Sequence, residues 1–225
     1  MVINEGTFIR INYSVKVGSQ LIDTTDEAEA QEAKIFEKTV TYEPLTVCVG
    51  QKYVVLGFDE AFIGKDAGFE GDVSVPPEKA YGERDSKRVK SFPKNSFSQK
   101  PTKGMTVRIE KVGEGRVTDI IGSKVIVDFN AVLAGHTLDY HYKIEDVIED
   151  PFEQLKGILK IYTGKNMDVA IVDGKATITL LPETFRDSLW LLWRSRIFHE
   201  AFTFIPSISD IELVEKIMRP EKTSE

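Results

Sequence analysis

The stretch that decides the fold is "GFDEAFIGKDAGFEGDVSVPPEKAYG", residues 57–82. Four apolar residues recur at near-helical spacing in it and just before it: Val54, Val55, Phe58 and Phe62. The run "FEGDVSVPP" then reads as a strand, and the chain reaches Tyr81 directly before Gly82. The pattern predicts one short helix lying on a sheet, and a tyrosine held at the lip of a strand.

Further strands are expected on both sides of this stretch. Residues 7–17 alternate well enough to place four side chains on one face: Ile9, Ile11, Tyr13 and Val15. Residues 20–25 and 44–50 read as two more strands, and residues 26–37 have helix-forming composition. The run "LDYHYKIEDVIED", residues 138–150, resembles these early strands more than it resembles the segment before it. We therefore expect a first domain that is interrupted and then resumed.

The interruption begins after Gly82, where the chain becomes polar and basic and is broken by Pro93 and Pro101. Three short strand-like runs follow, residues 105–110, 115–121 and 124–130, separated by glycine turns. This pattern predicts a small all-β insert over residues 84–134. The first domain then comprises residues 1–83 and 135–152.

A third domain is expected over residues 153–225, because the order of elements after Pro151 is α-β-β-α-β. Its long helix is expected to open at Pro182 and carries Trp190 and Trp193. Apolar residues spread around this helix beyond the stripe of about 100° that one-sided burial needs. A second copy of the chain is the simplest partner that could bury the remaining apolar surface of this helix, which predicts a homodimer through this domain.

Composition excludes several classes of protein. The chain has 225 residues with 36 acidic against 29 basic, a net charge of −7, so a nucleic-acid partner is not expected. No apolar run approaches the ~20 residues of a membrane span, and the single Cys48 excludes an internal disulfide, so we expect a cytoplasmic protein that does not bind membranes. Three scattered histidines argue against a metal site.

The quoted motifs resemble the FKBP family of peptidyl-prolyl cis-trans isomerases. The insert after Tyr81-Gly82 is similar to the insert-in-flap domain of the SlyD-like branch, and the additional C-terminal domain resembles the long archaeal members. The resemblance implies an α+β fold, in which an FKBP-like antiparallel sheet wraps on a short helix and is interrupted by the all-β insert. It also implies an enzyme that needs no cofactor.

The resemblance implies a site, position by position. The catalytic residues are expected to be Tyr13, Asp23, Phe58, Tyr81 and Tyr140. Further substrate-binding residues are expected to be Ile22, Leu45, Val54, Val55 and Leu133. Phe58 would form the pocket floor, where the family commonly has tryptophan, and Tyr140 stands where phenylalanine is usual. Tyr81 and the Val55 amide would hold substrate carbonyls, and Tyr13 would bond Asp23. Taken singly, Tyr13, Asp23 and Phe58 read as core or turn residues.

The insert carries many apolar residues for its size. Five of them are candidates for a chaperone surface: Phe92, Phe97, Met105, Ile120 and Ile121. An ordinary small core is an equally good interpretation. We therefore expect an isomerase that also binds unfolded or partly folded, proline-containing chains as a folding chaperone. The alternative is a chaperone or scaffold with the same fold and little isomerase activity.

Overall fold

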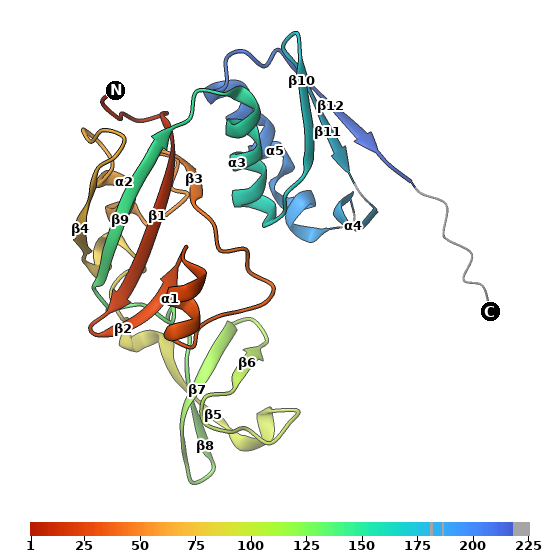
Figure 1. Cartoon of the computed structure of the whole chain (residues 1–225). Helices are drawn as coiled ribbons and strands as arrows, with labels where there is room; N and C mark the ends of the chain where they lie inside the picture. The colour runs from red at the N-terminus through yellow and green to blue at the C-terminus, as the bar shows by residue number, and fades with distance from the viewer. Residues whose placement is uncertain (181, 186, 218–225) are drawn as a thin grey trace, which may run out of the picture. The chain divides into compact units, whose positions relative to one another are not determined.

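The computed structural model describes residues 1–180, 182–185 and 187–217 (Figure 1). By contacts the chain forms two compact units, residues 1–73 with 139–225, and residues 74–138. In the part of the chain described, no helix is long and apolar enough to cross a membrane. The mixed α+β class expected from the sequence is confirmed.

The first sheet has five strands, β1 Phe8–Val17, β2 Gln20–Thr24, β3 Leu45–Cys48, β4 Glu70–Val75 and β9 Leu138–Val147. Its order is β2-β1-β9-β4, and β3 pairs with the first half of β1 (Figure 1). The pairs of β1 with β2, β3 and β9 are antiparallel. The strand that resumes after the insert therefore lies in the middle of the sheet, beside β1.

Two short helices accompany this sheet, α1 Glu27–Glu32 and α2 Leu56–Glu60. The first begins at Asp26, whose side chain accepts a hydrogen bond from the Glu29 amide at 2.8 Å, and it is shorter than the expected stretch. The second turns Phe58 inward, where it is fully buried. A short helix on a sheet is thus present where the glycine-bounded segment predicts it.

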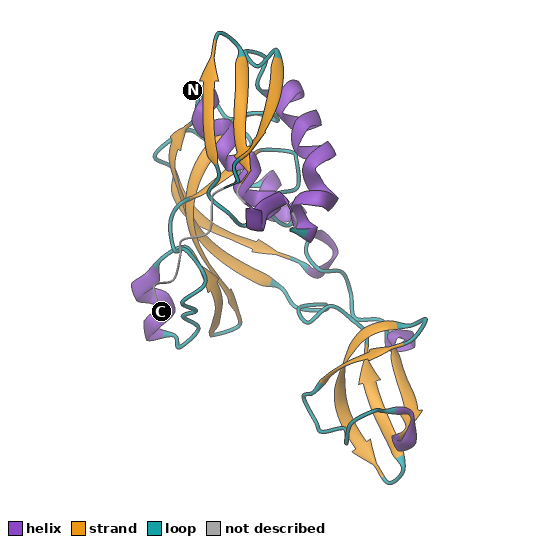
Figure 2. Ribbon diagram, turned by 90° about the vertical axis from the view of Figure 1, so that its right-hand side faces the viewer, coloured by secondary structure: helices purple, strands orange, loops and turns teal. Residues whose placement is uncertain are grey.

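The insert unit folds as a four-stranded antiparallel sheet in the order β5-β8-β7-β6. Its strands are drawn in orange at the lower right of Figure 2. The strands are β5 Val89–Pro93, β6 Thr106–Ile109, β7 Gly113–Ile121 and β8 Lys124–Asp128. Its buried core consists of Val107, Val117, Val125, Val127 and Phe129. The sequence predicts only three of these strands. β5 is added in the polar stretch, and Pro93 is tolerated there because it ends an edge strand.

The C-terminal segment contains α3 Pro151–Thr163, β10 Asp168–Val172, β11 Lys175–Leu180, α4 Pro182–Phe185, α5 Ser188–Phe204 and β12 Asp210–Glu215. β10 pairs antiparallel with β11, and β11 pairs parallel with β12. The helix expected from Pro182 is divided in two. The Asp187 side chain accepts a hydrogen bond from the Leu189 amide at 2.8 Å and so starts a new helix.

The C-terminal helices share a hydrophobic core with the first sheet. Phe8, Cys48 and Ile148 of the first sheet and its flank belong to one buried cluster with Leu155, Ile158, Leu159, Ala176, Ile178, Trp190, Ile197 and Ala201. Trp190 is only 1% exposed, and Trp193 packs half-buried against the same cluster. Contacts within the chain therefore bury part of the broad apolar surface of α5. The exposed apolar residues of α5 are Leu189, Leu191, Leu192 and Phe202.

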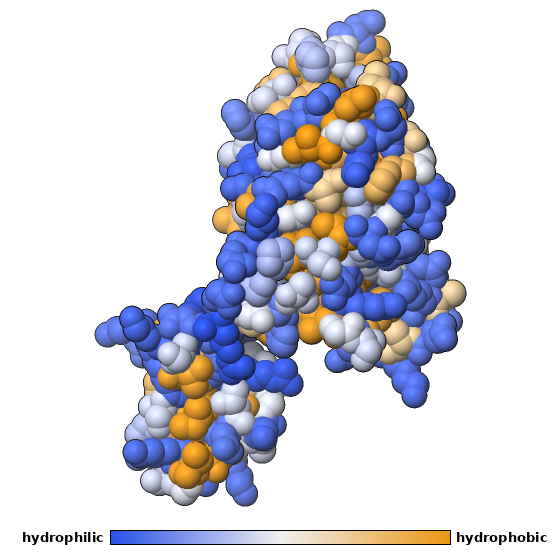
Figure 3. All heavy atoms as spheres, turned by 90° about the vertical axis from the view of Figure 1, so that its left-hand side faces the viewer, coloured by the Kyte–Doolittle hydropathy of each residue, from blue (hydrophilic) through white to orange (hydrophobic). Residues whose placement is uncertain are grey.

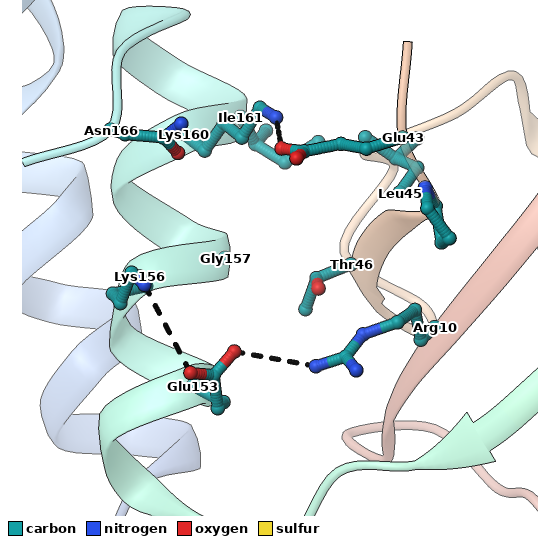
Figure 4. A pocket seen from close by; sticks show the side chains of 11 residues that line it. Arg10, Glu43, Leu45, Thr46, Glu153, Lys156, Gly157, Lys160, Ile161 and Asn166 are labelled. Carbon is teal, nitrogen blue, oxygen red and sulfur yellow. Dashed lines mark hydrogen bonds and ion pairs between the residues drawn. The ribbon is translucent and has the colours of Figure 1, made fainter. Parts of the chain in front are cut away.

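Helix α3 approaches the first sheet closely at Gly157. A Cβ atom placed there would lie 2.9 Å from the Thr46 Cβ and nearer still to the Thr46 methyl group. Figure 4 shows Thr46 pointing from β3 toward the helix at this position. Glycine lets the helix and strand backbones approach, at the cost of a weaker intrinsic helix preference.

We predict that Gly157→Ala lowers the free energy of unfolding by about 1–3 kcal/mol, as overpacking does elsewhere. The sign is informative, because alanine in an open helix would add about 1 kcal/mol of stability instead. Denaturant unfolding followed by tryptophan fluorescence measures it, since both tryptophans lie on α5. Adding Thr46→Ser removes the clashing methyl group and should restore part of the loss. A gain in stability from Gly157→Ala alone would contradict this packing.

Candidate functional site

Three aromatic rings converge on the inner face of the first sheet. Phe58 of α2 stacks on Tyr140 of β9, with ring centroids 4.0 Å apart and planes at 17°. Tyr13 of β1 meets Phe58 edge-on at 5.7 Å and Tyr140 at 6.0 Å. The residues come from three elements, so the sheet pairing and the helix position together build this aromatic cluster.

Tyr13 and Asp23 form the hydrogen bond that the resemblance implies. The Tyr13 hydroxyl donates to Asp23 Oδ2 at 2.8 Å, and Asp23 Oδ1 accepts from the Thr24 amide at 2.9 Å. The Tyr13 backbone is held as well, because its amide donates to Thr25 Oγ1 and its carbonyl accepts from the Thr25 amide, both at 2.9 Å. The phenol is therefore fixed at both ends of its side chain.

Val54 and Val55 lie in the loop that leads into α2, and both are half-buried. The Val55 carbonyl accepts from the amides of Phe58 and Asp59 at 3.0 Å, which ties the loop to the helix. Asp59 is itself buried, and its carboxylate accepts from the amides of Gly50 and Lys52 at 3.0–3.2 Å. Burial raises the pKa of Asp59, and the two backbone donors oppose that rise.

The remaining expected residues of the first unit have different surroundings. Ile22 is half-buried on β2. Leu45 of β3 lines a hollow of about 440 Å³ against α3 (Figure 4).

This hollow has charged walls. Arg10 pairs with Glu153 at 3.3 Å and with Asp146 at 3.6 Å, Lys156 lies 4.0 Å from Glu153, and Lys160 pairs with Glu43. These charges neutralise one another in pairs around the hollow, and partly exposed ion pairs of this kind contribute little to stability.

Tyr81 and Leu133 belong to the other unit. Tyr81 is 47% exposed and follows the 3-10 turn Pro77–Lys79. Gly82 adopts a φ of 79°, and its amide donates to the Pro77 carbonyl at 2.7 Å, so the chain bends directly after the tyrosine. Leu133 is half-buried. The structure thus brings together Tyr13, Asp23, Phe58 and Tyr140, with the loop of Val54 and Val55 bonded to the same helix.

The aromatic cluster is larger than the sequence analysis predicts. Tyr142 meets Phe58 at 5.3 Å, Phe62 at 5.5 Å and Phe69 at 5.6 Å, and its hydroxyl donates to the Ala61 carbonyl at 3.0 Å. Tyr140 and Tyr142 lie two residues apart on one strand, so they share a face. That spacing was the available signal for Tyr142.

The expected chaperone-surface residues divide into two groups. Phe92, Phe97, Met105 and Ile120 are half-buried and pack against the core of the insert, whereas Ile121 is 63% exposed. Figure 3 shows a column of hydrophobic side chains on one face of this unit. The residues therefore contribute to the small core and also leave apolar surface on the unit.

Reactive or metal-binding groups are not prominent in the described ranges. Burial raises the pKa of the Cys48 thiol to about 12, so it is an inert core residue at neutral pH. Within residues 1–180, 182–185 and 187–217, no three histidine, cysteine or acidic side chains are grouped to hold a metal ion.

Comparison with known proteins identifies relatives along most of the chain. Residues 2–98 match the family described as FKBP-type peptidyl-prolyl cis-trans isomerase, and residues 151–218 match the family described as FKBP26_C-terminal. A short-type peptidyl-prolyl cis-trans isomerase of Methanocaldococcus jannaschii is 34% identical over 148 residues, 64% of this chain and 94% of that protein.

Two bacterial relatives carry the name SlyD. The FKBP-type isomerase SlyD of Aeromonas hydrophila is 30% identical over 129 residues, 56% of this chain and 61% of that protein. The SlyD of Treponema pallidum is 31% identical over 115 residues, 49% of this chain and 65% of that protein. Because the Methanocaldococcus jannaschii relative is 34% identical and is covered almost throughout, the chain belongs to the FKBP-type peptidyl-prolyl cis-trans isomerase family and is an isomerase of that class.

Proposed function

We propose that the chain isomerises X-Pro peptide bonds in unfolded or partly folded polypeptides and that it also holds such chains as a folding chaperone. The observation that carries the proposal is the aromatic cluster of Tyr13, Phe58 and Tyr140, with Tyr13 bonded to Asp23. We assign substrate contact to these residues and to Ile22, Leu45, Val54 and Val55. On the family resemblance we add Tyr81 and Leu133.

The reaction requires little beyond a binding site of suitable shape from which water is excluded. Rotation about a prolyl amide faces a barrier of about 18–20 kcal/mol, because the planar form is stabilised by resonance. A twisted amide has lost that resonance, and its carbonyl is less polar than in either planar isomer. Aromatic rings that exclude water therefore favour the twisted form over the planar ones, and about 1.4 kcal/mol of this preference accelerates rotation tenfold.

Fixed donors would orient the substrate during this rotation. Val55 is the N-cap residue of α2, and its carbonyl accepts hydrogen bonds from the Phe58 and Asp59 amides, so the backbone that carries the Val55 amide is tied to the helix. The Tyr81 phenol is proposed as a second donor to a substrate carbonyl. No bond of the substrate is broken in this mechanism, so it needs no nucleophile and no proton transfer.

The domain roles follow from this assignment. We propose residues 1–83 with 135–152 as the isomerase domain, residues 84–134 as the chaperone insert, and residues 153–225 as a domain that forms a homodimer. The exposed leucines of α5 support the dimer. A cytoplasmic location is proposed with it, since the one cysteine is buried as a free thiol.

Exchange of the floor residue tests the site. Phe58→Leu keeps an apolar side chain but removes the ring that stacks on Tyr140, so kcat/KM for a short X-Pro peptide should fall roughly tenfold. Phe62→Leu is the matched control, because Phe62 is also fully buried and contacts Phe58 at 4.7 Å. A protease-coupled isomerisation assay measures both. Equal activity in the two variants would refute Phe58 as the floor.

Removal of the insert tests the chaperone role. The Gly135 amide donates to the Gly82 carbonyl at 2.8 Å, so the ends of residues 84–134 are adjacent and a short Gly-Ser linker can replace them. Turnover of a short peptide should survive. Catalysis of a proline-limited refolding reaction should fall roughly tenfold or more, because the insert would no longer hold the unfolded substrate protein close to the isomerase site. Unchanged refolding catalysis would show that the insert does not capture clients.

The homodimer is tested by light scattering at micromolar concentration. We predict a dimer for the native chain and a monomer for Leu192→Glu, since Leu192 is 67% exposed on α5. Val172→Glu serves as the control, because Val172 is 66% exposed on β10 and should leave the dimer intact. A native monomer would end the proposal, and dissociation by both variants would remove α5 as the specific contact.

A further inference from the structure

A buried carboxylate lies outside the aromatic cluster and has no part in the proposed chemistry. Glu200 of α5 is only 1% exposed, although glutamate side chains are seldom fully buried unless they are paired. Its Oε2 accepts a hydrogen bond from the Tyr53 hydroxyl at 2.6 Å, and its Oε1 accepts from the Tyr162 hydroxyl at 2.6 Å and from Arg196 Nε at 2.7 Å. The carboxylate therefore joins α5, α3 and a loop of the first domain.

The partners of Glu200 suit a permanent anchor. Burial and the nearby carboxylate raise the pKa of Tyr53, and they raise the pKa of Tyr162 to about 12, so both phenols remain protonated donors at neutral pH. Arg196 supplies a positive charge from its half-exposed position. A buried acid with one cation and two phenol donors has its hydrogen-bonding capacity largely satisfied.

Tyr53 connects this anchor to residues 50–55, the active-site loop, which leads into α2. It precedes Val54 and Val55 directly, and these lead into α2, which carries Phe58. Asp59 binds the earlier part of the loop through the Gly50 and Lys52 amides. The two acids thus hold successive parts of residues 50–55, Asp59 from the first domain and Glu200 from the C-terminal domain.

We propose that Glu200 is a positioning residue for the isomerase site, which acts through Tyr53 to fix the loop that presents the Val55 amide to substrate. The inference rests on the site assigned under the proposed function. It gives the C-terminal domain a second role, because α5 then contributes to substrate binding without touching the substrate. A fixed amide saves the ordering that a mobile loop would require on binding.

The pair Tyr53 and Tyr162 provides a matched test. Both hydroxyls donate to the same carboxylate at 2.6 Å, and the two rings pack edge-on with centroids 5.8 Å apart. Tyr162 lies on α3, however, and has no place in the active-site loop. The Tyr162 hydroxyl also accepts from Arg196 Nε at 2.8 Å. A merely structural network predicts that Tyr53→Phe and Tyr162→Phe both lower stability and leave catalysis alone, whereas positioning predicts an effect on catalysis from Tyr53→Phe alone.

The experiment measures KM and kcat of the full-length chain on a short X-Pro peptide, together with the melting temperature. Tyr53→Phe should raise KM roughly threefold to tenfold, the factor of a typical lost hydrogen bond, and leave kcat within about twofold. Tyr53→Phe and Tyr162→Phe should lower the melting temperature by similar amounts, but Tyr162→Phe should leave KM at the native value. Unchanged KM in Tyr53→Phe, or equal rises in both variants, would overturn the proposal.

Two further measurements keep the positioning role separate from the site assignment. Hydrogen exchange of the Asp59 amide, which donates to the Val55 carbonyl at 3.0 Å, should speed up without peptide in Tyr53→Phe and not in Tyr162→Phe, whatever the role of Phe58. Glu200→Gln keeps an acceptor for Tyr53 and should leave KM closer to native than Glu200→Met, which removes it. Equal exchange of the Asp59 amide in the native chain and Tyr53→Phe would refute the positioning role even if Phe58→Leu confirms the floor.

Discussion

The stack of Phe58 on Tyr140 is the contact on which the first sheet and its helix depend. It joins the short helix α2 to strand β9, and the whole insert lies between them in the sequence. The sheet order places β9 between β1 and β4, so the middle of the sheet is completed only when the chain returns from the insert. An insertion at this point is tolerated because its two ends meet at Gly82 and Gly135.

The same contact explains why the site is ready before substrate arrives. Phe58 is fully buried and Tyr140 nearly so, which means that the proposed floor is also part of the hydrophobic core. Core side chains are close-packed and held in single rotamers, so a surface built on them needs no reordering when a proline binds. Catalysis by shape alone requires this property, because no covalent step can compensate for a loosely held ring.

Much of this arrangement could be predicted because it depends on local periodicity. The alternation of residues 7–17 and 138–150 indicated β1 and β9, and the glycines around Phe58 indicated α2. The division of α4 from α5 was missed because it depends on a cap at Asp187. The inward direction of Trp190 and the bond from Tyr53 to Glu200 were missed as well. Both are set by tertiary contacts between residues far apart in sequence, which leave no periodic signal in either segment.

The polar character of the Glu200 contact is significant for how the C-terminal helices are joined to the first sheet and its loops. Phe8, Cys48 and Ile148 already bury apolar surface with α3 and α5, but apolar contact is non-directional and would allow the helices to slide. A buried carboxylate tolerates only the geometry that satisfies it, since an unpaired charge in the core is costly. Gly157 adds a steric limit, because a side chain at that position would clash with Thr46. Burial thus supplies the stability of the junction, while Glu200 and Gly157 determine the register in which the C-terminal helices meet the active-site loop.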